Sequence, residues 1–189
     1  MKLHLGCGRT LLEGWVNVDC VPAEGVTVCD LNDCRRTPLP FADDSVDEIF
    51  ASHLIEHITD TLPLMQELHR VAKNGSHAIF RLPYGSSDEA WEDPTHVRPY
   101  FIQSFQYFSQ PAYWRADYGY RGDWRIDRLV LCIEKGVQEK CAADLGNAIM
   151  RERNVVQEQV VELTAIKPIR QPLRELQSMP EIKVELIGK

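Results

Sequence analysis

The chain lacks any long apolar run, and no stretch approaches the roughly 18–20 apolar residues that a membrane-spanning helix needs. Its N-terminus has neither the apolar core nor the small-residue cleavage site of a secretory signal peptide. Internal repeats and low-complexity tracts are also missing, whereas 44% hydrophobic and 26% charged residues match an ordinary globular composition. These observations exclude a disordered, collagen-like or coiled-coil chain and predict a cytoplasmic protein without a membrane partner.

Positive charge is also scarce, because the 189 residues carry a formal net charge of −7. Such a chain has no general electrostatic attraction to nucleic acid, although a local basic patch would be compatible with it. Six cysteines are present, but no two form the C-x-x-C pair of a zinc ribbon or redox site. A chain of this length can bury a core without disulfides, so we expect reduced, structural cysteines.

The order of the apolar runs predicts an α/β fold. Eight short runs are typical of strands: 2–5, 15–18, 26–29, 46–51, 77–82, 125–133, 160–166 and 182–187. Between the fourth and fifth runs, Leu64, Leu68 and Val71 recur at helical spacing, and Asn74-Gly75 is expected to end that helix. Strands separated by helical or loop crossovers indicate a largely parallel sheet, and one domain covering residues 1–189 accommodates the pattern.

Glycines and polar residues follow the predicted strands at the points where these end. Gly6 and Gly8 follow the first strand, Asp19 the second, Asp30 the third, and Ser52-His53 the fourth. Ligands of such sheets bind beyond the carboxyl ends of the strands, near the point where the strand order reverses. The sequence therefore predicts a binding site on one rim of the sheet.

The turn at Gly6 and Gly8 lets a ligand approach the backbone closely, because neither residue carries a Cβ. A dinucleotide site would need a third glycine, where this chain has Leu11. It would also need an acidic residue about 20 positions further on, whereas Asp19 comes much earlier. A nicotinamide-dependent enzyme is therefore disfavoured.

Several segments resemble, in their order along the chain, one known family. They are residues 3–8 (LHLGCG), 14–19 (GWVNVD), 30–31 (DL), 39–47 (LPFADDSVD), 52–57 (SHLIEH) and 67–75 (ELHRVAKNG). Together they resemble the class I S-adenosylmethionine-dependent methyltransferases of the type 11 kind, over roughly residues 2–110. The resemblance implies a Rossmann-like three-layer sandwich, in which helical layers enclose a mostly parallel seven-stranded sheet with an antiparallel last strand.

The resemblance also assigns S-adenosylmethionine to the first two strand ends. Gly6 and Gly8, with Cys7 between them, would line the methionyl and ribose part of this cofactor. Asp19 would accept hydrogen bonds from the two ribose hydroxyls, a task suited to the two oxygens of a carboxylate. The alternative role for Asp19, and for Asp30, is to form a turn or a cap.

The next two strand ends would complete the cofactor site. By the same resemblance, Asp30 would face the exocyclic amine of adenine, and Leu31 would pack against the base or offer its backbone N–H. Ser52 and His53 would border the methionyl group near the methyl that is transferred.

The chain departs from the family in two places. Residues 70–76 read RVAKNGS where family members often have RVLKPGG, a change in a connecting loop. The sequence begins at the first strand, whereas many class I enzymes have preceding helices that cover the cofactor. We therefore expect the segment after residue 90 to cover the cofactor, or the cofactor to be held loosely. Residues 1–90 would form the cofactor-binding half and residues 91–189 the substrate or lid half.

Ten of the sixteen aromatic residues fall in residues 98–128, which we call the aromatic segment, where five arginines are interleaved with them. Planar rings and arginines that grip a carboxylate or phosphate would suit a substrate lid. The same mixture would suit a path for single-stranded nucleic acid. The other interpretation is core and dimer packing, since aromatic side chains are usually buried.

His53, Glu56 and His57 also fit H-x-x-E-H, the inverted zinc-peptidase motif. Because the motif stands where the methyltransferase family has Ser-His-x-x-Glu-His, a zinc metallopeptidase is a remote alternative and no metal is expected. Glu56 and His57 are instead expected to shape the pocket or orient neighbouring residues, with His57 a candidate catalytic residue and a purely structural role as the alternative.

His96 is the first candidate for a general base. It ends Asp93-Pro94-Thr95-His96, which follows the fifth strand at the same rim and resembles a motif of this subgroup. A histidine there could take a proton from an acceptor hydroxyl or amine, because its pKa lies near working pH. The alternative is a hydrogen bond that fixes the loop.

The sequence thus predicts an S-adenosylmethionine-dependent methyltransferase whose acceptor is a small metabolite or a glycan, with nucleic acid disfavoured. The alternative from a different class is a catalytically inactive S-adenosylmethionine-binding module that acts as a partner or regulatory subunit. Nothing in the sequence indicates an oligomeric state.

Overall fold

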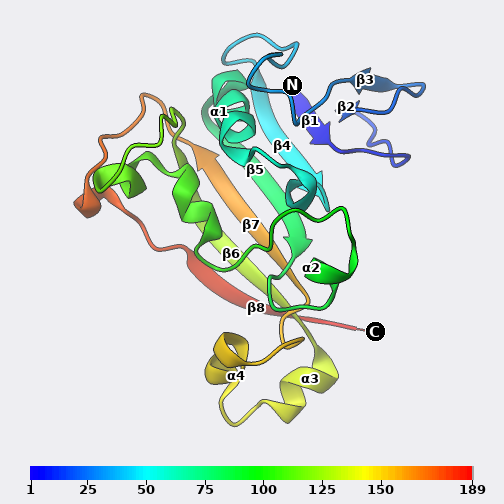
Figure 1. Ribbon diagram of the computed structural model, residues 1–189, viewed down its shortest axis with the longest axis vertical. Coiled ribbons are helices and arrows are strands. Elements are labelled where there is room, and N and C mark those ends of the chain that lie inside the picture. The colour runs from blue at the N-terminus through cyan, green and yellow to red at the C-terminus, as the bar shows by residue number, and fades with distance from the viewer. Residues whose placement is uncertain (189) are drawn as a thin grey trace.

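Eight strands of the described chain form one mixed sheet in the order β3-β2-β1-β4-β5-β7-β6-β8 (Figure 1). The computed structural model describes residues 1–188. The strands are β1 (Lys2–Leu5), β2 (Val16–Asp19), β3 (Val26–Val28), β4 (Val46–Ser52), β5 (Ala72–Pro83), β6 (Trp124–Glu134), β7 (Glu158–Ala165) and β8 (Glu181–Ile187). Strands β1 to β5 pair in parallel, β7 runs antiparallel to both β5 and β6, and β8 is parallel to β6.

The predicted α/β fold with a mostly parallel, Rossmann-like sheet is confirmed. The antiparallel seventh strand, β7, is inserted between β5 and β6. The family resemblance implied seven strands, and β8 adds an eighth at the edge of the sheet, at the apolar run over residues 182–187. Because β7 ends and β8 begins near the N-terminal end of β6, β8 runs opposite to β7 and therefore pairs in parallel with β6.

Helices are few. They are α1 (Thr61–Val71), α2 (Glu89–Glu92), α3 (Lys135–Lys140) and α4 (Leu145–Arg151), with the 3₁₀ helices η1 (Ile55–His57), η2 (Ser104–Phe108), η3 (Gln110–Trp114) and η4 (Arg174–Leu176). The helix predicted from periodicity is α1, and its apolar face is buried as expected. No helix of the described residues is long and apolar enough to cross a membrane.

The expected end of α1 at Asn74-Gly75 is wrong. The helix ends at Val71, and Asn74-Gly75 belongs to β5, which begins immediately afterwards. The pairing of β4 with β5 shifts register at this point, and Gly75 takes a φ of 82°. A glycine accommodates this left-handed conformation without the clash of a Cβ, so the same residue type that ends helices here permits a bulge.

One face of the sheet carries the main core. Along β5, Ala78, Phe80 and Leu82 are fully buried, whereas Ile79 and Arg81 on the other face are exposed. The covered face packs against α1 and the aromatic segment (Figure 1). The Phe105 ring of that segment stacks on Phe80 at 5.9 Å between centroids. Loops rather than helices connect β1, β2, β3 and β4, so the second helical layer of a three-layer sandwich is reduced in this chain.

The aromatic segment contributes mainly to this core. Tyr100, Phe105, Phe108, Tyr113, Tyr120 and Trp124 are buried. The Trp124 indole N–H donates to the Met65 carbonyl at 3.0 Å, which anchors the segment to α1. Four other rings remain exposed, namely those of Phe101, Tyr107, Trp114 and Tyr118. Core packing therefore accounts for most of the segment, and these four rings are the ones available for other contacts.

A buried ion pair joins the aromatic segment to the chain that leads into β8. Asp123 is fully buried, and its carboxylate accepts hydrogen bonds from the Arg170 guanidinium, with Nε at 2.8 Å and Nη2 at 2.8 Å. The backbone N–H groups of Arg170 and Gln110 complete the shell of donors. This pair fixes the path of residues 166–180 across the end of the sheet.

We expect Arg170→Met to lower the free energy of unfolding by about 3 kcal/mol, because Asp123 would remain buried without its charged partner. Arg121→Met is the matched control, since Arg121 pairs with Asp117 at a largely exposed site. That change should cost less than about 1 kcal/mol. Urea denaturation measures the free energy of unfolding of both variants. Equal losses of stability would contradict a stabilising role for the buried Asp123–Arg170 pair.

Candidate cofactor and active site

The turn after β1 leaves backbone accessible at Gly8. Gly6 and Gly8 have φ values of 63° and 52°, which favour glycine. A Cβ on Gly6 would lie 2.8 Å from Leu54 Cδ1, whereas one on Gly8 would meet no atom within 4 Å. The Cys7 side chain is buried and its N–H donates to the Val18 carbonyl at 3.1 Å, so Cys7 shapes the turn through its backbone.

Asp19, the last residue of β2, is joined to this turn. Its Oδ2 accepts the Gly8 N–H at 2.8 Å, and its Oδ1 accepts the Val21 N–H at 2.9 Å. Partial burial acts to raise the pKa of Asp19, but the backbone N–H donors of Val21 and Gly8 outweigh it and hold the pKa below its usual value. Asp19 is therefore an ionised carboxylate beside the glycine turn.

Asp30 lies two residues beyond β3 on the same rim. β2 and β3 pair in parallel with Asp19 opposite Val28, which brings the two strand ends together. The exposed Asp30 carboxylate accepts the Asn32 N–H at 2.9 Å, while the Leu31 side chain is buried in the core. The turn-forming role considered for Asp30 is thus observed, and its second oxygen accepts none of the hydrogen bonds found among the described residues.

His53 follows β4 in a left-handed conformation, with a φ of 51°, and its N–H donates to the Arg81 carbonyl at 2.8 Å. Its Nε2 lies 2.8 Å from Glu158 Oε1, and its Nδ1 lies 3.5 Å from Glu56 Oε1. The Glu158 carboxylate, and then that of Glu56, raise the pKa of His53 to about 10. His53 is therefore a cation at neutral pH and is unsuited to act as a base.

Sequence reasoning missed Glu158, the residue that fixes His53. Glu158 begins β7 and also binds the Arg81 guanidinium, with Nε at 2.8 Å from Oε2. Its residue number lies 105 positions from His53. Only the insertion of the antiparallel β7 beside β5 brings it to the rim, so no local signal in the sequence could have identified it.

The two candidate catalytic histidines, His57 and His96, lie together. Their ring centroids are 4.7 Å apart in an edge-on arrangement. The Val97 N–H donates to the Glu56 carbonyl at 2.9 Å, which holds the segment after α2 against η1. His57 Nδ1 lies 3.0 Å from Thr95 Oγ1, and His96 Nδ1 lies 3.3 Å from the Ala90 carbonyl oxygen. The loop-fixing contact considered for His96 is present, and it leaves Nε2 of the ring for other chemistry.

The H-x-x-E-H residues do not form the arrangement of a zinc peptidase. His53 precedes the short helix η1 in a left-handed conformation, so His53 and His57 do not share one face of a helix. The His53 ring contacts Glu158 and Glu56, whereas the His57 ring contacts Thr95 and His96.

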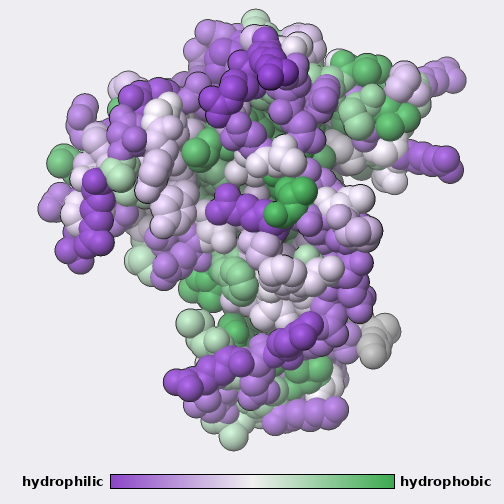
Figure 2. All heavy atoms as spheres, viewed as in Figure 1, coloured by the Kyte–Doolittle hydropathy of each residue, from purple (hydrophilic) through white to green (hydrophobic). Residues whose placement is uncertain are grey.

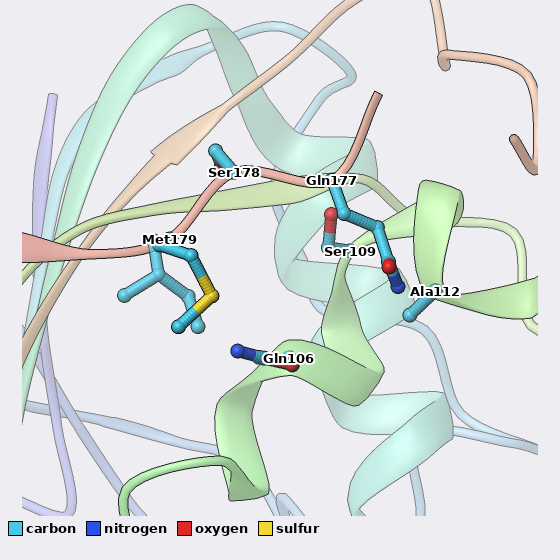
Figure 3. Close-up of a pocket in the computed structure, with 7 residues that line it drawn as sticks. Gln106, Ser109, Ala112, Gln177, Ser178 and Met179 are labelled. Atoms are coloured by element: carbon cyan, nitrogen blue, oxygen red, sulfur yellow. The ribbon is translucent and has the colours of Figure 1, made fainter. Parts of the chain in front are cut away.

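Two cavities lie away from this rim. The smaller, about 50 Å³, lies between η2, η3 and the segment before β8, where the side chains of Gln106 and Met179 point toward each other (Figure 3). The larger, about 630 Å³, lies between α4, Phe101 and Ile182 and has a mainly apolar lining. Figure 2 shows the molecule hollowed between the sheet and the α3–α4 segment, with apolar atoms at the border. The predicted cofactor residues line neither cavity.

Comparison with known proteins shows what this fold is similar to. A model of the methyltransferase domain family matches residues 19–80, which run from the end of β2 into β5. No curated protein sequence gives a significant match. The family match covers Asp19, Asp30, Leu31, Ser52 and His53, all of which the sequence assigned to the cofactor.

Solved structures share the fold. An S-adenosylmethionine-dependent methyltransferase from Archaeoglobus fulgidus has a TM-score of 0.58 at 19% identity, covering 86% of this chain and 85% of that one. Phosphoethanolamine N-methyltransferase 2 of Haemonchus contortus, solved with S-adenosylhomocysteine, has a TM-score of 0.52 at 13% identity, covering 88% and 48%. The [4+2]-cyclase SpnF has a TM-score of 0.52 at 12% identity, covering 87% and 75%. The likeness in fold to S-adenosylmethionine-dependent methyltransferases is therefore confirmed.

Glu158 should make the stability of the protein depend on acidic pH. The hydrogen bond from His53 lowers the pKa of Glu158 to about 2, against 4.5 for an ordinary glutamate. Since the pKa is depressed in the folded state, this stabilisation is complete above about pH 4.5 and is lost as the pH falls through 2. Glu158→Gln should lower the free energy of unfolding by roughly 2 kcal/mol at pH 7. In urea titrations, the difference in free energy of unfolding between wild type and Glu158→Gln should narrow between pH 5 and pH 3. A difference that stays constant over this range would contradict the lowered pKa of Glu158.

Proposed function

We propose that the chain is an S-adenosylmethionine-dependent methyltransferase that binds its cofactor at the carboxyl ends of β1, β2, β3 and β4. The observation that carries the proposal is the hydrogen bond from the Gly8 backbone to the Asp19 carboxylate, which places an ionised acceptor beside an uncovered glycine turn. This pair lies where β1 has β2 on one side and β4 on the other, the point of strand reversal at which such sheets bind ligands. The family match over residues 19–80 supports the same cofactor.

In this proposal each rim residue has one task. Asp19 accepts the ribose hydroxyls, Asp30 faces the adenine amine, and Leu31 supports the base from the core. The turn Gly6-Cys7-Gly8 lets the methionyl and ribose part approach the backbone. Ser52 and His53 border the methionyl group, where the cationic His53 ring suits its carboxylate.

The reaction would depend mainly on positioning. When bound, S-adenosylmethionine supplies a methyl group that its sulfonium already makes electrophilic. The residues of this chain would hold the acceptor in line with that methyl and exclude water. His57 and His96 would lie next to the acceptor. In each ring Nδ1 is hydrogen-bonded to the protein, which leaves Nε2 to take a proton from the acceptor.

The proposed domain is residues 1–189, with a cofactor-binding half over residues 1–90 and a substrate half over residues 91–189. The acceptor in this proposal is a small molecule or a glycan. A net charge of −7 argues against nucleic acid. The loop with α2 lies next to the proposed cofactor rim, as Glu89 Oε1 is 4.0 Å from His53 Nδ1.

The second candidate function is a cofactor-binding module without methyl transfer. The similarity to SpnF, a cyclase, favours it, because this fold also occurs in a protein named for a different reaction. The two functions differ in one product. A methyltransferase given a panel of hydroxyl and amine acceptors releases S-adenosylhomocysteine, whereas the module binds S-adenosylmethionine and releases none.

Asp19→Asn tests the proposed cofactor site. The change keeps the size of the side chain but removes the charge that would bind the ribose, so affinity for S-adenosylmethionine should fall by roughly 10- to 100-fold. Isothermal titration calorimetry measures it. Glu24→Gln, which removes a charge from the exposed turn between β2 and β3, is the control and should bind as wild type does. Unchanged affinity of Asp19→Asn would refute the assigned role.

A further inference from the structure

Three potential metal ligands meet beside the proposed cofactor rim. Glu56, His57 and His96 each offer one ligand atom, and these atoms all lie within 4.8 Å of one another. The first two come from η1 and the third from the loop after α2, so the cluster exists only in the folded chain. The cluster shares Glu56 and His57 with the H-x-x-E-H motif, but its third member is His96 and not His53.

Both histidines are oriented as metal ligands are. A ligating histidine almost always donates its other ring N–H to an oxygen, which fixes its tautomer and its angle. His57 Nδ1 lies 3.0 Å from Thr95 Oγ1, and His96 Nδ1 lies 3.3 Å from the Ala90 carbonyl oxygen. The Thr95 hydroxyl is itself held by Asp93 Oδ1 at 2.6 Å. These contacts leave the Nε2 atoms of both rings for a ligand, and His96 Nε2 lies 4.0 Å from Glu56 Oε1.

The surroundings of the Glu56 carboxylate independently indicate a missing partner at this cluster. Its side chain is only 3% exposed, and neither carboxylate oxygen accepts a hydrogen bond from the described residues. His53 approaches Oε1 at 3.5 Å, an ion-pair distance without hydrogen-bond geometry. Burying a carboxylate whose acceptors are unfilled is costly, and a metal ion would add a close partner to the long contact with the His53 cation.

We propose that Glu56, His57 and His96 bind one divalent first-row transition-metal ion. Two imidazoles and one carboxylate suit Zn²⁺, Mn²⁺ or Fe²⁺ rather than Ca²⁺ or Mg²⁺, which prefer oxygen ligands throughout. Ligands about 2.1 Å from one tetrahedral ion lie about 3.5 Å apart, so the three side chains would close by about 1 Å.

The role of the ion rests on the proposed function. Three protein ligands leave at least one position for an oxygen of the acceptor, whose hydroxyl would lose its proton to solvent more readily when bound to the ion. The O–CH₃ bond would form as the S–CH₃ bond breaks, and no oxidant or reductant is needed. His57 and His96 would then hold the ion instead of acting as bases, and the acceptor class would be a hydroxyl compound.

Metal binding is tested directly, without cofactor or acceptor. The untagged full chain, stripped with a chelator, is titrated with Zn²⁺ and with Mn²⁺ by calorimetry, and bound metal is counted after dialysis. We expect one equivalent per chain and at least a tenfold loss of affinity in Glu56→Gln and in His96→Asn. The control is His77→Asn, which removes an exposed histidine from β5 and should bind as wild type does.

Thermal unfolding of each variant without metal shows whether it folds, and wild type should unfold at a higher temperature with Zn²⁺ than without it. Mn²⁺ separates this site from the six cysteines, because thiolates are poor ligands for it. The proposal would be overturned if folded wild type bound no metal, or if Glu56→Gln and His96→Asn bound the metal as tightly as wild type does. Because cofactor binding is measured separately with Asp19→Asn, failure of the metal site and failure of the proposed function are distinguishable.

Discussion

The pairing of β1 with β2 on one side and β4 on the other is the constraint on which the rest of the structure depends. Parallel strands end at the same edge of a sheet, so this pairing gathers the glycine turn, Asp19 and His53 from three separate parts of the chain. The buried side chains of these strands, including Leu5, Val18 and Ile49, fix the register. A slip of one residue would turn them to the opposite face and disperse the rim.

The second half of the chain completes the rim from outside this parallel unit. The antiparallel β7 places Glu158 against His53, and the loop after α2 places His96 against His57. The aromatic segment supports both by filling the core under β5 and β6, and the Tyr100 hydroxyl donates to the Ile55 carbonyl at 3.3 Å. The acidic and histidine side chains are thus held by packing that is mostly apolar.

Much of the fold could be predicted because strand signals are local. Short apolar runs located every strand of the described chain, and periodicity located α1. The end of α1 could not be predicted, because Asn74-Gly75 is equally suited to a helix end and to a bulge, and pairing with β4 decided between them. The aromatic segment was ambiguous for a similar reason, since aromatic rings suit a lid or a core and only burial distinguishes the two.

By itself, the sequence determined the strands, the residues at their ends and the resemblance to class I methyltransferases, because these depend on residue type and spacing over short stretches. Only the tertiary structure decided which of those residues meet. It joined His53 to Glu158, brought His96 to Glu56 and His57, and buried Asp123 against Arg170. Such contacts link positions far apart in the chain, and their geometry follows from strand order and packing, which no local pattern specifies.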